Sequence, residues 1–461
     1  MAALTLVPTA GRLFRLAGLL TLCTLAVLAI ASPASAHTRL LSSTPAADTI
    51  LRPGVHIPVR LVFSEPIEAS LATITITGPD GVARQLRVRA DGRDVHAALS
   101  DWLSGGAGKY SVVWHVVSAD GHPVDGSFAF TVEGDTATAD SAATPALTPP
   151  VSGATVDSAR DAAQVEHERL EAWPEVPVLP AMLRAAAAFF ILATAGLLAF
   201  IGWRTDEERR RDTHGLLTWL AAGAFLLSAA HAVAWSFYAT GDAPGSSMRA
   251  LGTAAARAEI ARVVFTLIAL ACVVITRRIA WATAFAWLAL FATVAIGHAA
   301  AIHPLLLLPL KAVHLAAAAM WLGGLLVLLR RTPPHVEATV IADTALRVST
   351  VALIGVVLLA ASGVAQSLVL LTPGQILTTK YGVLSLAKAG VLVVLIAMGA
   401  INKFRNLPAV LRGEAVDRLR RTVVLEVVVI VLAFLLAGAL AYTSPPESPA
   451  AADSLQSMVM P

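Results

Sequence analysis

The sequence predicts two folds joined in one chain: a small all-β sandwich or Greek-key barrel, followed by an α-helical membrane domain with eight spans. Hydrophobic residues make up 56% of the 461 residues, and the mean hydropathy is +0.71. Both values are typical of a polytopic membrane protein. Residues 37–134 differ from the rest, because short β-rich runs alternate there with Gly and Asp turn signals.

Residues 1–36 are expected to form a secretory signal peptide. Arg12 and Arg15 supply the positive start, an apolar run follows, and ASPASA offers small residues for cleavage. Cleavage after Ala36 would leave His37 as the first residue of the mature chain. The alternative is an uncleaved signal anchor, but the helix-breaking Pro33 favours cleavage.

The β-domain is expected to span residues 37–134, long enough for one sandwich core. Its strand-like runs are HIPVRLVF, LATITIT, RQLRVRA, GKYSVVWHVV and GSFAFTV. In the fourth run, the alternation of side chains would place Trp114 in the core and His115 outside. Residues 135–177, rich in Ala, Thr, Ser and Pro, predict a flexible linker, and residues 444–461 predict a disordered tail.

The membrane domain is expected at residues 178–443, where apolar segments are long enough to cross a bilayer. Arg277 and Arg278 alone separate the third segment from the fourth. The eight expected spans lie near residues 180–203, 214–238, 257–276, 279–297, 305–329, 347–371, 383–401 and 422–443.

Basic residues fix the expected orientation of these spans. They concentrate in the odd-numbered loops, around residues 204–211, 277–278, 330–347 and 403–421. The positive-inside rule places those loops in the cytoplasm, so the β-domain, the even-numbered loops and the C-terminal tail face outside the cytoplasmic membrane. The formal net charge of +3 is small, and short basic runs of this kind do not indicate nucleic-acid binding.

The two cysteines limit the metal chemistry available. Cys23 lies in the expected signal peptide and Cys272 in an apolar run. The mature chain would therefore have neither an internal disulfide nor a thiolate cluster. A metal site would have to use His, Asp, Glu, Met or backbone groups.

A histidine at the first position of a mature chain has two nitrogen ligands, its α-amino group and its imidazole Nδ1. This pair suits Cu(II), which prefers tetragonal nitrogen and oxygen ligands. The stretch SADGHPVDG adds Asp120 and His122, which point to one face of an extended segment. Alone, these two residues would indicate only a polar surface turn. Together with His37, they indicate a metal site.

The β-domain resembles the periplasmic copper-resistance protein family CopC. The N-terminal histidine, FSEP, and the block WHVVSADGHPVDG occur in the order typical of that family. The resemblance implies a cupredoxin-like fold and a Cu(II) site formed by His37, Asp120 and His122. Some members also bind Cu(I) through methionines, but this chain has no methionine between Met1 and Met182. We therefore expect Cu(II) to be the only copper ion bound by this domain.

Four histidines of the membrane half fall toward the expected outer face: His231, His298, His303 and His314. Polar residues in spans often serve only helix packing, but ionisable ones are candidates for function. Lys311, Lys388 and the group Arg257, Glu259 and Arg262 are expected on the same side.

The membrane half resembles the CopD family of inner-membrane copper proteins. The matching stretches are GHA at 297–299, AVHLAAAAMWLGGL at 312–325, YGVLSLAK at 381–388 and the region of Asn402. Fusions of the two families are associated with copper uptake. By this resemblance, His298, His303 and His314 would form an outer copper site, with His231 as a further member. The pair Gly323-Gly324 is expected to allow close helix packing.

Two functions remain open at this point. In the first, the β-domain captures Cu(II) and passes it to the membrane domain for import. In the second, the protein binds and delivers copper, or confers resistance, without moving it across the bilayer. Neither is an enzyme, and the chain has no phosphate-binding P-loop. Expected partners are copper ions, membrane lipid and periplasmic copper carriers. Oxidative polysaccharide cleavage and haem ligation are weaker alternatives.

Overall fold

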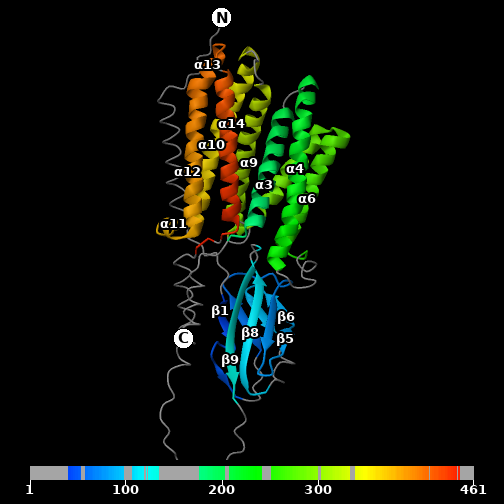
Figure 1. Ribbon diagram of the computed structural model, residues 1–461, viewed down its shortest axis with the longest axis vertical. Helices are drawn as coiled ribbons and strands as arrows, with labels where there is room; N and C mark the ends of the chain where they lie inside the picture. The colour runs from blue at the N-terminus through cyan, green and yellow to red at the C-terminus, as the bar shows by residue number, and fades with distance from the viewer. Residues whose placement is uncertain are drawn as a thin grey trace, which may run out of the picture.

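The computed structural model places a β-sandwich against one end of a bundle of long helices (Figure 1). The residues that the structure describes are 40–52, 58–97, 106–118, 121, 123–133, 176–202, 207–240, 251–298, 303–332, 338–414, 416–443 and 445–446. The predicted signal peptide, most of the predicted linker and nearly all of the predicted tail lie outside them.

The β-domain consists of two packed sheets. One has the strand order β1-β3-β7-β6 and the other β2-β9-β8-β4-β5. The strands are β1 (Leu40–Thr44), β2 (Ile50–Leu51), β3 (Val59–Phe63), β4 (Thr73–Thr77), β5 (Ala83–Leu86), β6 (Val88–Asp91), β7 (Asp94–Ala97), β8 (Gly108–Val117) and β9 (Pro123–Val132).

Side-chain alternation along β8 builds much of the core between the sheets. Tyr110, Val112, Trp114 and Val116 are buried, while His115 lies on the opposite face. Trp114 packs edge-on against Phe63 of the other sheet, with ring centroids 5.1 Å apart. Burying an aromatic or large aliphatic side chain contributes about 1.5–3 kcal/mol. The predicted sandwich is confirmed, as is the inward Trp114 and outward His115.

The helical part contains long helices joined by short connections. The two short π-helical segments, η2 and η3, extend α6 and α12 respectively. The helices are α3 (Val178–Gly202), α4 (Glu207–Thr240), α6 (Ala254–Ala271), η2 (Cys272–Thr276), α7 (Ile279–Val294), α9 (Pro304–Arg331), α10 (Ala338–Leu370), α11 (Gln375–Thr378), α12 (Lys380–Ile401), η3 (Asn402–Asn406), α13 (Leu407–Leu411) and α14 (Val416–Ala441).

Within the described residues, seven helices are long and apolar enough to cross a membrane, one fewer than predicted. The fourth expected span, 279–297, is the exception, because its helix α7 has only 16 residues. At 1.5 Å per residue it is about 24 Å long, shorter than a hydrocarbon core of about 30 Å. The apolar sequence continues past Val294, but Gly297, with a φ of 92°, belongs to a turn.

Helices α3 and α9 touch backbone to backbone in the middle of the bundle. A Cβ atom on Gly196 would lie 1.8 Å from the carbonyl oxygen of Ala319. A Cβ on Gly323 would lie 2.2 Å from the carbonyl carbon of Gly196. No larger side chain fits at either position, so the predicted packing role of Gly323 is confirmed.

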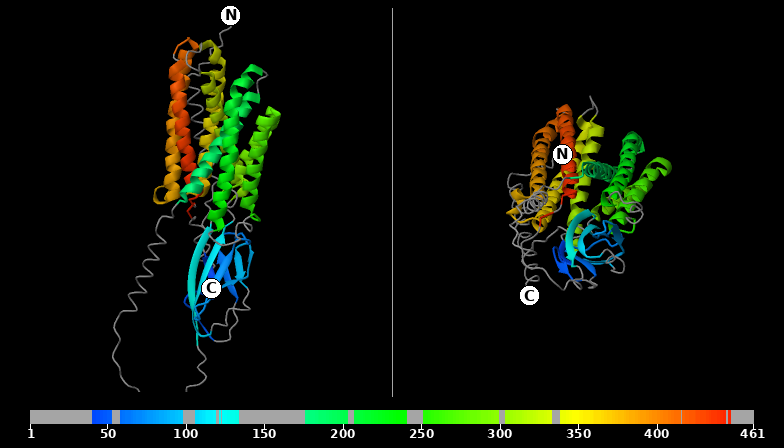
Figure 2. Two further views of the ribbon diagram at one scale, coloured as in Figure 1. Left: turned by 45° about the vertical axis from the view of Figure 1, so that its right-hand side comes forward. Right: turned by 60° about the horizontal axis from the view of Figure 1, so that its bottom comes forward.

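The β-domain rests on the ends of α4 and α6 (Figure 2). The amide of Ala254 donates to Glu68 Oε1 at 3.2 Å, and His115 Nε2 lies 3.3 Å from the carbonyl oxygen of Ala239. Trp235 is buried in a small apolar cluster with Ala239, Ala255 and Ala256. These contacts place the β8–β9 end of the sandwich against the helix bundle. We call this end of the bundle the docking end.

Candidate copper site and its surroundings

The three predicted copper ligands of the β-domain, His37, Asp120 and His122, lie outside the described residues. The strands that flank two of them are well defined, since Val117 of β8 pairs with Pro123 of β9. Gly121 between them has a φ of 90°, in the left-handed region that favours glycine. The amide of Gly121 donates to the carbonyl of Ser118 at 2.9 Å, so Gly121 lies in the tight connection between β8 and β9. The ligand set itself stays a prediction.

This turn faces the helix bundle. A Cβ atom on Gly121 would lie 3.4 Å both from Trp235 Nε1 on α4 and from the Cβ of Ala255 on α6. Gly121 therefore lies at the interface between the two parts of the protein. The sequence contained no signal for this contact.

His115 also takes part in the interface. Its Nδ1 lies 2.6 Å from Asp125 Oδ1, and its Nε2 faces the carbonyl of Ala239. The hydrogen bond with Asp125 raises the pKa of the His115 imidazole, because it stabilises the protonated form. A protonated ring donates to both partners and links the β-domain to α4. The alternation of side chains predicted that His115 lies outside the core, but no local sequence pattern indicated its role in the interface.

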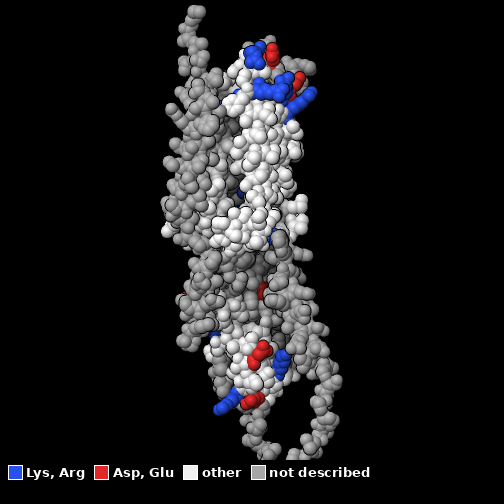
Figure 3. All heavy atoms as spheres, turned by 90° about the vertical axis from the view of Figure 1, so that its left-hand side faces the viewer, with Lys and Arg blue, Asp and Glu red and all other residues white. Residues whose placement is uncertain are grey.

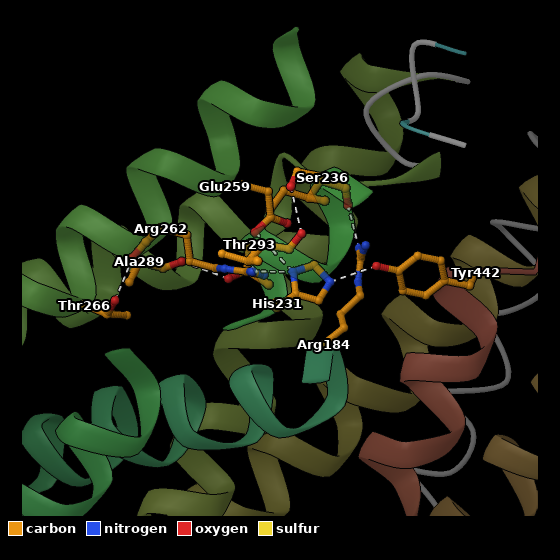
Figure 4. A network of polar contacts seen from close by, with 11 residues as sticks. Arg184, His231, Ser236, Glu259, Arg262, Thr266, Ala289, Thr293 and Tyr442 are labelled. Carbon is orange, nitrogen blue, oxygen red and sulfur yellow. Dashed lines mark hydrogen bonds and ion pairs between the residues drawn. The ribbon is translucent and has the colours of Figure 1, made fainter. Parts of the chain in front are cut away.

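In the bundle, His231 lies at the centre of a fully buried polar network (Figure 4). His231 Nδ1 lies 2.7 Å from Arg262 Nη2 and 3.2 Å from Glu259 Oε2, and Arg262 also pairs with Glu259. His231 Nε2 lies 2.9 Å from the hydroxyl oxygen of Tyr442. Both ring nitrogens of His231 are thus occupied by protein groups.

The other three membrane histidines occupy separate positions. His298 is buried, and its Nε2 lies 3.1 Å from the carbonyl oxygen of Thr443. His314 is half-buried, with Nδ1 3.0 Å from Ser362 Oγ, whereas His303 is exposed at the start of α9.

The four histidines therefore share one end of the bundle without forming one cluster. Among the described residues, no three His, Cys, Asp or Glu side chains gather as metal ligands would. A copper path through His298, His303, His314 and His231 stays a prediction. Each buried imidazole would have to exchange a protein partner for the metal.

Two cationic side chains meet beside these histidines. Arg184 Nη2 on α3 and Lys311 Nζ on α9 donate to the same carbonyl, that of Ile296, at 3.2 and 2.5 Å. The guanidinium of Arg184 also lies 5.7 Å from the ring centroid of Tyr442. The docking end is therefore rich in positive charge. Lys311 was noted in the sequence, whereas Arg184, Tyr442 and Thr443 were not.

A second buried polar group lies toward the opposite end of the bundle. Glu426 on α14 is 1% exposed and accepts a hydrogen bond from Asn402 Nδ2 at 2.6 Å. Asn406 donates to Asn402 Oδ1 at 2.7 Å and to Thr422 Oγ1 at 3.1 Å. Of these residues, only the region of Asn402 stood out in the sequence. A carboxylate within the apolar stretch that follows the first turns of α14 was a signal that could have identified Glu426.

Comparison with known proteins agrees with both parts of the fold. The family model described as the CopC domain matches residues 40–133, and the model described as copper resistance protein D matches residues 342–440. The copper resistance protein C of Escherichia coli is 32% identical over 115 residues, which cover 23% of this chain and 90% of that protein. Copper resistance protein C of Xanthomonas campestris pv. juglandis is 34% identical over 127 residues, 24% of this chain and 96% of that protein.

Two solved copper-resistance proteins each match about a fifth of this chain. CopC from Methylosinus trichosporium OB3b is 23% identical, covers 22% of this chain with all of its own length, and superposes with a TM-score of 0.20. PcoC, a methionine-rich copper resistance protein from Escherichia coli, is 31% identical, covers 21% of this chain with 99% of its own length, and gives a TM-score of 0.18.

The spanning helices and the docked sandwich define a multi-pass membrane protein with a separate copper-handling β-domain. The chain belongs to the CopC family of copper resistance proteins, and it joins a CopC domain to a CopD domain in one polypeptide.

Proposed function

We propose that the protein captures Cu(II) outside the cytoplasmic membrane and passes it to the helix bundle for import. One observation carries this proposal: the turn between β8 and β9 lies against Trp235 and Ala255. Copper held by His37, Asp120 and His122 would start at the docking end of the bundle. Transfer would then need only a small displacement of the β-domain.

The ligand set fits Cu(II) chemically. The amine and imidazole of His37, the carboxylate of Asp120 and the imidazole of His122 are nitrogen and oxygen ligands, which Cu(II) prefers in a tetragonal arrangement. The absence of methionine between Met1 and Met182 disfavours a Cu(I) site in this domain. The related proteins named for copper resistance support copper as the ion.

The charge distribution supports an orientation with the β-domain outside the cell membrane. On the face shown in Figure 3, Lys and Arg gather at the end of the bundle opposite the β-domain. Arg330 and Arg331 lie in the last turn of α9, and Lys403 and Arg405 lie in η3, at that end. Positive residues favour the cytoplasmic side of a membrane.

A second function is delivery or storage of copper without transport. The structure offers one observation in its favour, since His231, His298 and His314 each interact with a protein group. In this conformation, the described residues do not form a group of three or more side chains that could bind a metal ion. Under this alternative, the docked β-domain would exchange copper only with other carriers outside the membrane.

Copper flux separates the two functions. The full chain would be reconstituted in proteoliposomes with the β-domain outward, and uptake of radioactive Cu(II) measured. If the protein imports copper, uptake should be lost in the His37→Ala variant. His96→Ala is the matched control, because His96 lies on strand β7 of the other sheet. Tight binding of Cu(II) without uptake would reject import and favour delivery.

A further inference from the structure

The docking end of the helix bundle holds more basic than acidic side chains, and one of the basic side chains, Arg262, is fully buried while the other three are half-buried. Four basic side chains reach it from four helices, whereas Glu259 is the one carboxylate among the described residues of these helices at this end. The basic residues are Arg184 on α3, Arg262 on α6, Lys311 on α9 and Lys388 on α12. We call these four side chains the basic cluster.

Arg262 is the most enclosed member of the basic cluster. Its side chain is 0% exposed, and one of its terminal nitrogens, Nη2, contacts Glu259 and His231. Its other two nitrogens, Nε and Nη1, have no hydrogen-bond partner among the described residues, and the same holds for Glu259 Oε1. Buried donors of a charged group are rarely left unpaired, because losing water without a replacement is costly.

Arg184 and Lys311 are also incompletely compensated. Both donate to the carbonyl of Ile296, a neutral oxygen that cannot cancel two positive charges. Arginine and lysine side chains only donate hydrogen bonds, so an acceptor with negative charge would both satisfy their donors and balance their charge.

We propose that the basic cluster binds a small, singly charged anion, such as a halide or a small carboxylate. Arg184 and Lys311, which meet at the carbonyl of Ile296, supply the donors, and Arg262 and Lys388 add positive charge. A free copper ion would be repelled at this place, since like charges in a poorly solvated environment repel strongly. The bound anion lowers that positive potential. A cation could therefore pass the docking end close to the bound anion. The anion site does not depend on the direction in which copper moves.

Thermal unfolding of the full chain in detergent tests the site without copper. Midpoints would be measured in sodium chloride, in sodium formate and in sodium gluconate at equal ionic strength, gluconate being too bulky for an enclosed site. A bound anion stabilises the folded state by mass action. We expect chloride or formate to raise the midpoint by about 2–4 °C in a saturable manner. Equal midpoints in all three salts would overturn the proposal.

Variants locate the effect. Lys311→Met and Arg184→Gln should each abolish most of the anion-dependent rise, and both leave the pair of Arg262 with Glu259 in place. Arg257→Gln is the matched control, because Arg257 is exposed on the same helix as Arg262 and donates to the carbonyl of Gly252. A full response to chloride in the first two variants would reject the basic cluster as the site.

A lipid headgroup carries the same kind of negative oxygen. Thermal unfolding would therefore also be measured in sodium gluconate with phosphatidylglycerol added to the detergent. Stabilisation by this lipid, with none by chloride or formate, would overturn the proposal and assign the cluster to lipid. Because copper is absent from these measurements, failure of copper import in proteoliposomes would leave the anion result unchanged.

Discussion

At the scale of single residues, His115 shows how a surface position becomes part of an interface. Asp125 lies opposite it on the neighbouring strand β9, and the carbonyl of Ala239 approaches its other nitrogen. The carboxylate raises the pKa of His115 above its ordinary value of 6.5. Protonated His115 can therefore hold strand β9 and helix α4 at the same time.

The pH dependence follows from the sign of this shift. A raised pKa contributes stability that is fully present below pH 6.5 and is lost as the pH rises through the value in the folded protein. The contribution should be about 0.2–1 kcal/mol, because Asp125 is largely exposed. Asp125→Asn should flatten the change in the melting temperature of the full chain between pH 6 and pH 8. His96→Gln should keep the wild-type profile, and an unchanged profile in Asp125→Asn would contradict this role.

His37 permits a test that depends on its position rather than its side chain. One alanine inserted between Ala36 and His37 moves the free amine away from the imidazole and removes the predicted chelate. We expect the variant to lose the tetragonal Cu(II) signal in electron paramagnetic resonance as fully as His37→Ala does. Mass spectrometry of the mature N-terminus serves as the control for cleavage. A retained signal in the insertion variant would rule out the amine as a ligand.

At the scale of elements, periodicity predicted most of the structure. Strand β8 could be predicted because buried and outward residues alternate strictly along it. Long apolar runs predicted the spanning helices. The end of α7 could not be predicted from the sequence. Ala295 and Ile296 continue its apolar sequence, although the backbone already turns toward Gly297. Hydropathy records composition, whereas a turn depends on backbone angles.

The crossing of α3 and α9 gives a prediction for stability. Gly323→Ala would place a methyl group against the backbone of Gly196, and overpacking of this kind costs about 1–3 kcal/mol. Gly390→Ala in α12 is the matched control, because nothing lies within 4 Å of its Cβ position. Thermal unfolding in detergent should show a lower midpoint for the first variant only. Equal midpoints would mean that the two helices can move apart at little cost.

At the scale of the whole molecule, the candidate site could be predicted only in part. The four membrane histidines stood out as polar residues in apolar runs. Their partners did not, because Tyr442 lies 211 residues from His231 and Thr443 lies 145 residues from His298 in the sequence. Contacts of this range depend on how helices pack, which no local pattern encodes. The contact between the β-domain and the helix bundle could not be predicted for the same reason.

Docking itself can be tested by a substitution at the interface. Ala255→Trp would fill the space between α6 and Gly121 and push the β-domain away from the bundle. We expect Cu(II) binding by electron paramagnetic resonance to persist while copper uptake into proteoliposomes falls several-fold. Val264→Trp is the control, since Val264 is exposed on the same helix. Normal uptake in Ala255→Trp would show that transfer does not need the docked arrangement.

The short helix α7 has a consequence for the surrounding lipid. Trp281, Leu288 and Phe291 are exposed on α7, so acyl chains pack against a surface that is about 6 Å shorter than an average bilayer core. The lipid must thin beside this helix, and the strain of thinning grows with acyl-chain length. The protein should therefore be more stable in bilayers of short-chain phosphatidylcholine than in long-chain ones, as measured by its thermal midpoint. The membrane would then be thinnest next to the turn that leads to His298.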